Sequence, residues 1–337
     1  MSRRTFLQGS SALGVASLLG LPGLAAAEPP PETRKIRLVL AETMCLAPQY
    51  IAEEFLRAEG FEQIEYVPIQ AASGKYSPIW IPGMLADSIA DISMSAAPGL
   101  VAAIDRGAQV TVIGGIHAGC YELFGNGDIH TVRDLKGRAI AVAEAGDERL
   151  FIGSMMSYVG MNPGTDVRWV VTRSSDDSMR LFTEEKVDAF LGFPPQPQEL
   201  RSRRIGRMFL STAADRPWSQ YFCCVVAGNR NFVRNNPVAT KRVLRALLKA
   251  ADVCARDPNR AVQYMLDKGY VKDRQYAMGL LADLPYDRWR KADPEDTLRF
   301  YALRLREIGM VRNGPQKIIA DGTDWRYLNE LKRELKA

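Results

Sequence analysis

The sequence has 337 residues, of which 47% are hydrophobic and 25% are charged, and its formal net charge is +5. These fractions are typical of a globular protein and exclude a disordered chain, a collagen-like chain and a small disulfide-rich scaffold. The length predicts about two domains, because one domain usually holds roughly 100 to 200 residues. The positive charge is too small and too scattered to indicate a nucleic-acid partner or an anionic lipid surface.

The first 27 residues have the pattern of a cleaved export signal. Arg3 and Arg4 precede an uncharged, moderately apolar run that ends in Ala25 to Ala27. The segment Ser2 to Leu7 is similar to the twin-arginine consensus, which addresses folded proteins for export. A membrane anchor is the alternative, but residues such as Gly9, Gly14, Gly20 and Pro22 interrupt a run that is barely long enough to span a bilayer. We therefore predict a twin-arginine signal peptide over residues 1–27 and a mature protein in the periplasm.

After this signal, strands and helices alternate along the chain. The first series has predicted strands at 36–41, 64–69, 92–94 and 110–116, and helices at 48–58, 82–89 and 98–106. The second series has strands at 139–143, 167–171, 187–191 and 208–211, and helices at 147–159 and 176–184. Such alternation implies crossover connections and parallel sheets.

From Asn236 onwards the pattern becomes helical. Asn236 is the predicted N-cap of a long helix with Pro237 at its first position. The predicted buried stripe of this helix comprises Val243, Leu244, Leu247, Leu248 and Ala251. Further helices are predicted at 261–267, 273–281, 294–308 and 327–335.

The order of these elements resembles the periplasmic solute-binding proteins of ABC importers, in the branch that binds nitrate, sulfonates, taurine and thiamine-pyrimidine precursors. Three segments carry the resemblance: Ala90 to Met94, Asp134 to Val142 and Lys186 to Phe190. It implies an α/β fold, the two-lobed type II periplasmic binding protein, with a mainly parallel sheet flanked by helices in each lobe and two hinge crossings. It also implies a monomer that binds a small-molecule ligand and docks on an inner-membrane ABC permease complex, without a cofactor or catalysis.

The resemblance places the crossings near Ala118 to Tyr121 and Gln220 to Cys223. Lobe one then comprises residues 34–118 and 222–337, with the C-terminal helices, and lobe two comprises residues 119–221. The segment from Asp134 to Val142 is interpreted as a structural part of its lobe and not as a ligand-binding segment, because apolar residues beside a tight turn usually build a core. Asp188 is likewise interpreted as a residue that caps or orients a turn.

Candidate ligand-binding residues follow from the rule that open parallel sheets bind ligands beyond the carboxyl ends of their strands. In lobe one the rule selects Glu42, Thr43, Ser95, Ala96 and Ala97, and His117 and Tyr121 flank the first crossing. In lobe two it selects Glu144, Gly146, Asp147, Ser174, Ser175 and the run from Phe193 to Gln196.

Several of these residues have a structural alternative. Asp147 and Ser175 are plausible N-caps of their own helices. His117 is interpreted as a structural hydrogen-bonding residue, because no nucleophile with an orienting acid is recognisable beside it. Glu42 closes a buried strand, so its carboxylate needs either water or a partner.

The expected charge of the ligand follows from two opposing features. Three helix N-termini, together with Arg173 and Lys75, favour an anion. Glu42 and Glu144 oppose one, because a like-charge pair at about 4 Å costs roughly 4 kcal/mol, whereas one helix terminus returns about 0.3 to 1 kcal/mol. We therefore expect an organic ligand with a cationic or donor-rich group rather than nitrate or bicarbonate.

The five cysteines are Cys45, Cys120, Cys223, Cys224 and Cys254. None of them follows the signal closely enough to be a lipidated N-terminus. The hinge crossings bring Cys120 near the pair Cys223 and Cys224, where a disulfide and buried free thiols are both compatible with the sequence. No CxxC spacing is present, and only two histidines occur, so the sequence indicates no metal site.

Two other functions are compatible with the same fold. The fungal pyrimidine synthases of thiamine biosynthesis are enzymes with a Cys-Cys-Cys-Phe-Cys signature, whereas this chain has only Phe222, Cys223 and Cys224 before Val225. A periplasmic sensor adaptor would bind the ligand and signal to a membrane receptor. The expected function is an exported receptor that captures a small polar molecule and delivers it to an importer.

Overall fold

The computed structural model describes residues 28–41, 43–69, 81–144 and 146–336. The chain from Pro31 onwards forms one compact unit. The predicted signal peptide and the candidate residues Glu42 and Lys75 lie outside the described residues. We keep the names lobe one and lobe two for the residue ranges given above, and the division itself stays a prediction.

Lobe one contains two small sheets. Strands β1 (Lys35–Leu40) and β2 (Gln63–Pro68) pair in parallel. The other sheet has the order β3-β10-β4, with β3 at Ile92–Ala96, β10 at Phe222–Asn229 and β4 at Val110–Ala118. Strand β10 runs antiparallel to both of its neighbours, because the chain returns to this sheet from lobe two and enters it from the opposite end.

Lobe two contains a single sheet of five strands in the order β7-β6-β8-β5-β9. These strands are β5 (Glu122–Gly125), β6 (Ala139–Ala143), β7 (Arg168–Thr172), β8 (Ala189–Gly192) and β9 (Arg207–Ser211). Strand β6 pairs in parallel with β7 and β8, whereas β5 runs antiparallel to β8 and β9. The predicted α/β class is therefore confirmed, with the difference that the strand following each crossing is antiparallel to its neighbours.

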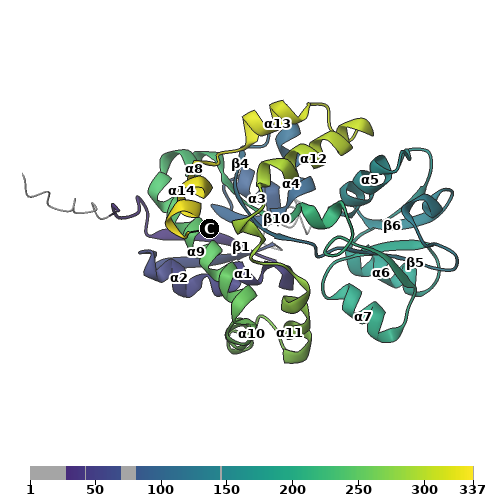
Figure 1. Ribbon diagram of the computed structural model, residues 1–337, viewed down its shortest axis with the longest axis horizontal. Helices are drawn as coiled ribbons and strands as arrows, with labels where there is room; N and C mark the ends of the chain where they lie inside the picture. Colours follow the sequence, from purple (N-terminus) through teal and green to yellow (C-terminus); the bar gives the residue numbers. More distant parts are fainter. Residues whose placement is uncertain (1–27, 42, 70–80, 145, 337) are drawn as a thin grey trace, which may run out of the picture. The chain divides into compact units, whose positions relative to one another are not determined.

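Helices flank these sheets (Figure 1). They are α1 (Ala47–Ile51), α2 (Glu53–Ala58), α3 (Ile81–Ala86), α4 (Ala97–Asp105), α5 (Glu148–Tyr158), α6 (Ser175–Thr183), α7 (Gln196–Arg203), α8 (Arg230–Asn235), α9 (Pro237–Arg256), α10 (Pro258–Asp267), α11 (Arg274–Asp283), α12 (Pro294–Glu307), α13 (Pro315–Gly322) and α14 (Arg326–Glu334). Short 3₁₀ helices lie at η1 (Met44–Leu46), η3 (Val132–Leu135), η4 (Trp218–Gln220) and η5 (Arg288–Arg290). None of the helices in the described ranges is long and apolar enough to cross a membrane.

The long helix α9 shows how the apolar period determines packing. All five residues of its predicted stripe are fully buried, because residues three and four positions apart share one helix face. Asn236 is the N-cap residue of α9 and Pro237 its first residue, as predicted. The Asn236 side chain, however, makes no cap hydrogen bond, and its Nδ2 instead donates to the Phe232 carbonyl at 3.1 Å.

The structural interpretation of the two acidic turn residues is confirmed by their contacts. Asp188 Oδ2 accepts a hydrogen bond from the Ala139 backbone N–H at 2.7 Å, which ties the turn before β8 to the start of β6. Asp134 Oδ2 accepts from the Thr131 backbone N–H at 2.8 Å and completes a capping box at η3.

The two segments that cross between the sheets lie against each other. They comprise residues 119–121, between β4 and β5, and residues 212–221, between β9 and β10. The Tyr121 carbonyl accepts hydrogen bonds from the Thr212 backbone N–H at 2.9 Å and from the Thr212 hydroxyl at 3.0 Å. Gly119 has a positive φ of +79°, and a Cβ there would lie 2.5 Å from Ala213 Cβ. Only glycine accommodates both the backbone conformation and this close approach.

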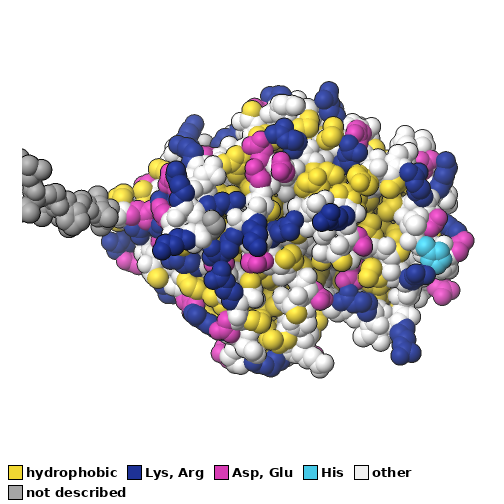
Figure 2. Space-filling model, in the orientation of Figure 1, with side chains coloured by type: hydrophobic (Ala, Val, Ile, Leu, Met, Phe, Trp, Pro, Cys, Tyr) yellow, Lys and Arg dark blue, Asp and Glu magenta, His cyan; other side chains and the backbone are white. Residues whose placement is uncertain are grey.

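Lys and Arg side chains are interspersed with Asp and Glu on the face shown in Figure 2. Exposed ion pairs in the described residues include Lys35 with Glu65 at 2.9 Å and Lys317 with Asp321 at 2.6 Å. Mixed charge of this kind is typical of a solvated surface and provides no extended field of one sign.

Candidate functional site

The first turns of helices α4 and α5 face each other where the two lobes meet. A Cβ on Gly99, in the first turn of α4, would lie 2.2 Å from Asp147 Oδ1, at the start of α5. Nearby, the Thr43 hydroxyl of lobe one lies 3.5 Å from the Pro194 carbonyl of lobe two. Buried apolar residues of both lobes also belong to one continuous core. The lobes are therefore packed together, with polar groups where their strand ends meet.

Asp147 faces this junction from the N-cap position of α5. Its side chain makes no cap hydrogen bond, so the N-cap alternative is correct for its position but not for its carboxylate. Burial, the neighbouring Glu148 carboxylate and the Cys224 side chain together raise the pKa of Asp147 well above its ordinary value. A carboxyl group held in this way gains free energy from a hydrogen-bond donor or a cation placed against it.

Glu148 is the polar residue that the sequence analysis missed. Only 2% of its surface is exposed, and neither of its carboxylate oxygens has a well-formed hydrogen bond within the described residues. The carboxylate occupies the space beside Gly146, where a Cβ would lie 1.5 Å from Glu148 Oε2. Burial raises the pKa of Glu148 to about 7, and weaker interactions with its own backbone N–H and the Ser175 hydroxyl offset only part of this effect.

The sequence did contain a signal for Glu148. It precedes Phe151 by three residues and Met155 by seven, so it lies on the face of α5 that carries the apolar stripe. A carboxylate at a stripe position is buried when the helix packs. Buried ionisable groups without a partner are typical of binding and catalytic sites.

A second buried polar group lies at the start of α6 and α7. The Ser175 hydroxyl donates to Gln196 Oε1 at 3.1 Å, and Gln196 Nε2 donates to Asp176 Oδ1 at 2.8 Å. Ser175 and Gln196 are both about 4% exposed. The predicted cap of α6 is displaced by one residue, because Ser174, not Ser175, accepts the cap hydrogen bond from the Asp177 backbone N–H at 3.1 Å.

Aromatic rings form a third part of the junction. The Tyr121 ring lies 4.2 Å from the Phe151 ring and 5.8 Å from the Phe193 ring, measured between centroids. Burial is the main cause that raises the pKa of Tyr121 well above its ordinary value, and the nearby Asp147 carboxylate adds to it. These rings provide flat apolar surface beside the two carboxyl groups, an arrangement that suits an organic ligand.

The remaining candidates occupy different environments. Ser95, Ala96 and Ala97 are buried at the end of β3 and the start of α4. Glu144 is exposed, so its charge is hydrated and contributes less to the predicted repulsion of an anion than a buried carboxylate would. At the junction, Glu148 is the buried carboxylate and Asp147 beside it is half-buried, so these two groups carry the argument that a bare anion would be repelled.

His117 is fully buried at the end of β4. Its Nδ1 lies 3.1 Å from the Ala118 carbonyl, and its ring meets the Tyr286 ring edge-on at 5.1 Å between centroids. The Nδ1 contact agrees with a structural hydrogen-bonding role, but Nε2 has no partner within the described residues. Around this ring lie the buried thiols of Cys45 and Cys224.

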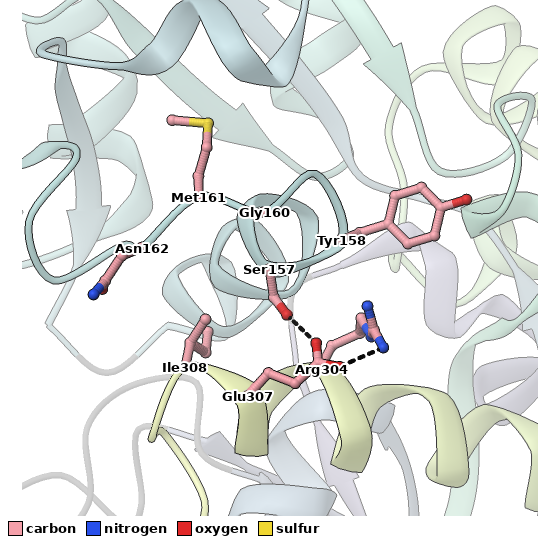
Figure 3. Close-up of a pocket in the computed structure, with 8 residues that line it drawn as sticks. All are labelled: Ser157, Tyr158, Gly160, Met161, Asn162, Arg304, Glu307 and Ile308. Carbon is pink, nitrogen blue, oxygen red and sulfur yellow. Dashed lines mark hydrogen bonds and ion pairs between the residues drawn. The ribbon is translucent and has the colours of Figure 1, made fainter.

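A pocket of about 490 Å³ opens elsewhere, between the C-terminal end of α5 and α12 (Figure 3). Glu307 accepts a hydrogen bond from the Ser157 hydroxyl at 2.6 Å and pairs with Arg304 at 2.6 Å. Glu307 is therefore paired on both sides, and Arg304 Nε is the one charged-group atom of this lining without a partner in the described residues, whereas both carboxylate oxygens of Glu148 lack one.

Comparisons with known proteins place the chain in a family. The sequence profile described as "NMT1/THI5 like" matches residues 69–261. Among curated proteins, no sequence matches the chain.

Solved structures with this fold include several periplasmic binding proteins. The nitrate-binding protein NrtA from Synechocystis PCC 6803 has a TM-score of 0.67 and 15% identity, over 91% of this chain and 90% of that one. The sulfonate-binding protein SsuA from Methylobacillus flagellatus KT has a TM-score of 0.64 and 17% identity, over 89% and 94% of the two chains. The alkanesulfonate-binding SsuA from Xanthomonas axonopodis pv. citri, bound to MOPS, has a TM-score of 0.64 and 16% identity, over 89% and 100%. These similarities show the fold.

Proposed function

Because the chain belongs to the NMT1/THI5-like family, we propose that it is the periplasmic solute receptor of an ABC importer. It binds a small polar molecule between its lobes and delivers it to an inner-membrane permease. The observation that carries this proposal is the buried Glu148 carboxylate at the lobe junction, without a well-formed hydrogen bond. The proposal is supported by the shared fold of sulfonate- and nitrate-binding proteins.

The mechanism is a shift of population between open and closed lobes. A ligand that contacts both lobes only when they are closed binds the closed form more tightly, and this difference in affinity drives closure. Lobe two contributes Asp147, Glu148 and the ring of Phe193. Lobe one contributes Thr43 and the first turn of α4 around Gly99. No chemical step is part of this function.

The ligand class follows from the same carboxyl groups. A bare anion placed between Asp147 and Glu148 would be repelled by both when they are ionised, and burial strengthens this repulsion. A protonated amine or an amino-substituted ring would supply the hydrogen-bond donors that Glu148 lacks and would pack on the Tyr121 ring. We therefore propose an organic ligand with a cationic or donor-rich group, although the neighbours named above bind nitrate and sulfonates.

A thermal-shift screen tests the receptor function. The panel comprises amines and aminopyrimidines together with alkanesulfonates, nitrate and bicarbonate. At a hundred times its dissociation constant, a ligand specific for the folded state adds about 2.7 kcal/mol of stability. We expect an amine or an aminopyrimidine to raise the melting temperature and to be recovered unchanged by mass spectrometry.

Two variants test whether Glu148 contacts the ligand, and the outcome of the screen distinguishes a failure of the receptor function from a failure of the ligand class. Glu148→Gln should reduce the ligand-induced shift, whereas Glu144→Gln, which changes an exposed carboxylate four positions away, should leave the shift intact. Chemical conversion of the bound compound contradicts the receptor and favours an enzyme. An inorganic anion as the best ligand contradicts only the ligand class.

A further inference from the structure

Four buried thiols and one imidazole converge at the base of the lobe junction. Cys45 comes from η1 just after β1, His117 from the end of β4, Cys120 from the first crossing segment, and Cys223 and Cys224 from the start of β10. These elements are brought together by the sheet, because Cys224 pairs directly with His117 across β10 and β4. The cluster therefore belongs to the fold itself and not to a surface loop.

Two groups of three can be distinguished within this cluster. Cys45, His117 and Cys224 each offer one donor atom, and these atoms lie within 4.8 Å of one another. Cys120, Cys223 and Cys224 form the other group, in which the sulfurs of Cys120 and Cys223 are 2.7 Å apart. Cys224 belongs to both groups. Because Cys120 and Cys223 lie against each other, Cys224 is the thiol that can turn to Cys45 and His117.

The imidazole of His117 has one ring nitrogen that is available to bind a metal ion. Its Nδ1 lies 3.1 Å from the Ala118 carbonyl, and since a carbonyl only accepts hydrogen bonds, we assign the ring proton to Nδ1. The lone pair then lies on Nε2, which is fully buried and has no hydrogen-bond partner within the described residues. This is the arrangement in which a second hydrogen bond orients a metal-ligating histidine.

We propose that Cys45, His117 and Cys224 bind a divalent thiophilic cation, Zn²⁺, with a fourth coordination position left open. Sulfur and imidazole nitrogen are the donors that Zn²⁺ prefers, whereas Mg²⁺ and Ca²⁺ require oxygen. A tetrahedral zinc ion keeps such donor atoms roughly 3.3 to 3.8 Å apart. The group therefore needs only small side-chain rotations to close around the ion.

The charge balance supports a divalent ion in this apolar surrounding. Binding removes one proton from each of the two thiols and releases both to solvent, while His117 stays neutral. Two thiolates then cancel the charge of Zn²⁺, and no net charge remains buried. A monovalent Cu⁺ with the same donors would leave one negative charge in the core.

The position of the site gives it a structural consequence. Cys45 lies two residues after Thr43, whose hydroxyl is 3.2 Å from the Cys45 sulfur and also faces Pro194 of lobe two. A bound ion would fix η1 to β4 and β10 directly behind that contact. Metal binding should therefore stabilise the fold, and it does so independently of the solute proposed above.

The experiment uses the mature chain, reduced and freed of metal with a chelator. Zn²⁺ is added and its stoichiometry is measured by elemental analysis, and Co²⁺ is used as a spectroscopic probe. We expect one ion per chain, a higher melting temperature with Zn²⁺ and a thiolate-to-cobalt charge-transfer band in the near ultraviolet. Cys45→Ser and Cys224→Ser should each weaken Zn²⁺ binding at least tenfold.

Matched variants test whether Zn²⁺ binds to Cys45, His117 and Cys224 and not to the other cysteines. Cys254→Ser changes a buried thiol on α9 outside the cluster and should bind Zn²⁺ as the wild type does. A variant with both Cys120→Ser and Cys223→Ser should also retain the ion. If that double variant loses Zn²⁺ while Cys45→Ser keeps it, the assignment to Cys45, His117 and Cys224 is overturned.

A measurement on the wild-type chain avoids variants that fail to fold. Zn²⁺ should slow alkylation of Cys45 and Cys224, as read by peptide mapping, more than it slows alkylation of Cys254. A wild-type chain that binds no Zn²⁺, that binds Cu⁺ in its place, or that shows equal protection of all three thiols would overturn the proposal.

Discussion

Replacing the Glu148 carboxyl group with an amide should stabilise the ligand-free protein, and more so as the pH rises. Glu148 is buried, and its pKa is raised from 4.5 to about 7 in the folded protein. In the unfolded chain it ionises near its ordinary value. Between these two values the folded state holds a proton that the unfolded state has lost, so the free energy of unfolding falls as the pH rises. Above pH 7 the stability that the protonated Glu148 side chain retains at low pH has been lost.

The size of the effect follows from the same two values. One pKa unit corresponds to about 1.4 kcal/mol, so the ionised Glu148 destabilises the folded state by about 3 kcal/mol at high pH. The side chain in the Glu148→Gln variant cannot ionise, so this variant does not lose stability through that position as the pH rises. Its free energy of unfolding relative to wild type should therefore increase by about 2 to 3 kcal/mol between pH 5 and pH 8.

Urea denaturation of the two proteins at pH 5 and pH 8 measures this difference. Removing the Glu148 charge also relieves the upward shift that it imposes on the pKa of Asp147, which changes the stability in the same direction. Glu144→Gln is the control, and it should match wild type at both pH values because Glu144 is exposed. A Glu148→Gln variant whose stability relative to wild type is the same at pH 5 and pH 8 refutes the claim that this carboxylate is buried without compensation.

Three further outcomes are expected. Gly119→Ala should lower the free energy of unfolding by about 1 to 3 kcal/mol more than Gly137→Ala, because both positions have a positive φ but only the first would clash with a neighbour; equal losses in thermal denaturation contradict this. Mild oxidation of the metal-free protein should join Cys120 to Cys223, whose sulfurs are 2.7 Å apart, and five free thiols after oxidation exclude the bridge. Gly99→Ala should displace the Asp147 carboxylate, which lies opposite Gly99, and should weaken ligand binding about tenfold in calorimetry. An unchanged affinity would show that the approach of Gly99 to Asp147 is not part of the ligand site.

The fold was largely predictable because most elements carry their own local pattern. Strand β6 is found at its predicted residues, and the stripe of α9 is buried throughout. Strands β5 and β10 were not predicted, because each follows a crossing and its partners are distant in sequence. Helix α7 was also missed, since two prolines precede it and its short sequence has little apolar periodicity.

The candidate site was predictable only in outline. The rule for strand ends selected Asp147 and Gln196, whose role as ligand-binding residues stays a prediction, and it could not distinguish exposed Glu144 from buried Glu148. The cluster of thiols and imidazole could not be predicted from the spacing of its residues in the sequence. Cys45, His117 and Cys224 meet only through the pairing of β4 with β10 and the position of η1. Local patterns determine elements, whereas sites of this kind depend on how the elements pack.

A crystal structure of the protein with the best compound from the thermal-shift screen would show whether a solute binds at the junction around Glu148. We expect an unmodified organic molecule between the lobes, with a hydrogen-bond donor about 2.7 to 3.2 Å from a Glu148 carboxylate oxygen and a face against the Tyr121 ring. A ligand bound instead in the pocket between α5 and α12, or a chemically altered product at the junction, would contradict this expectation.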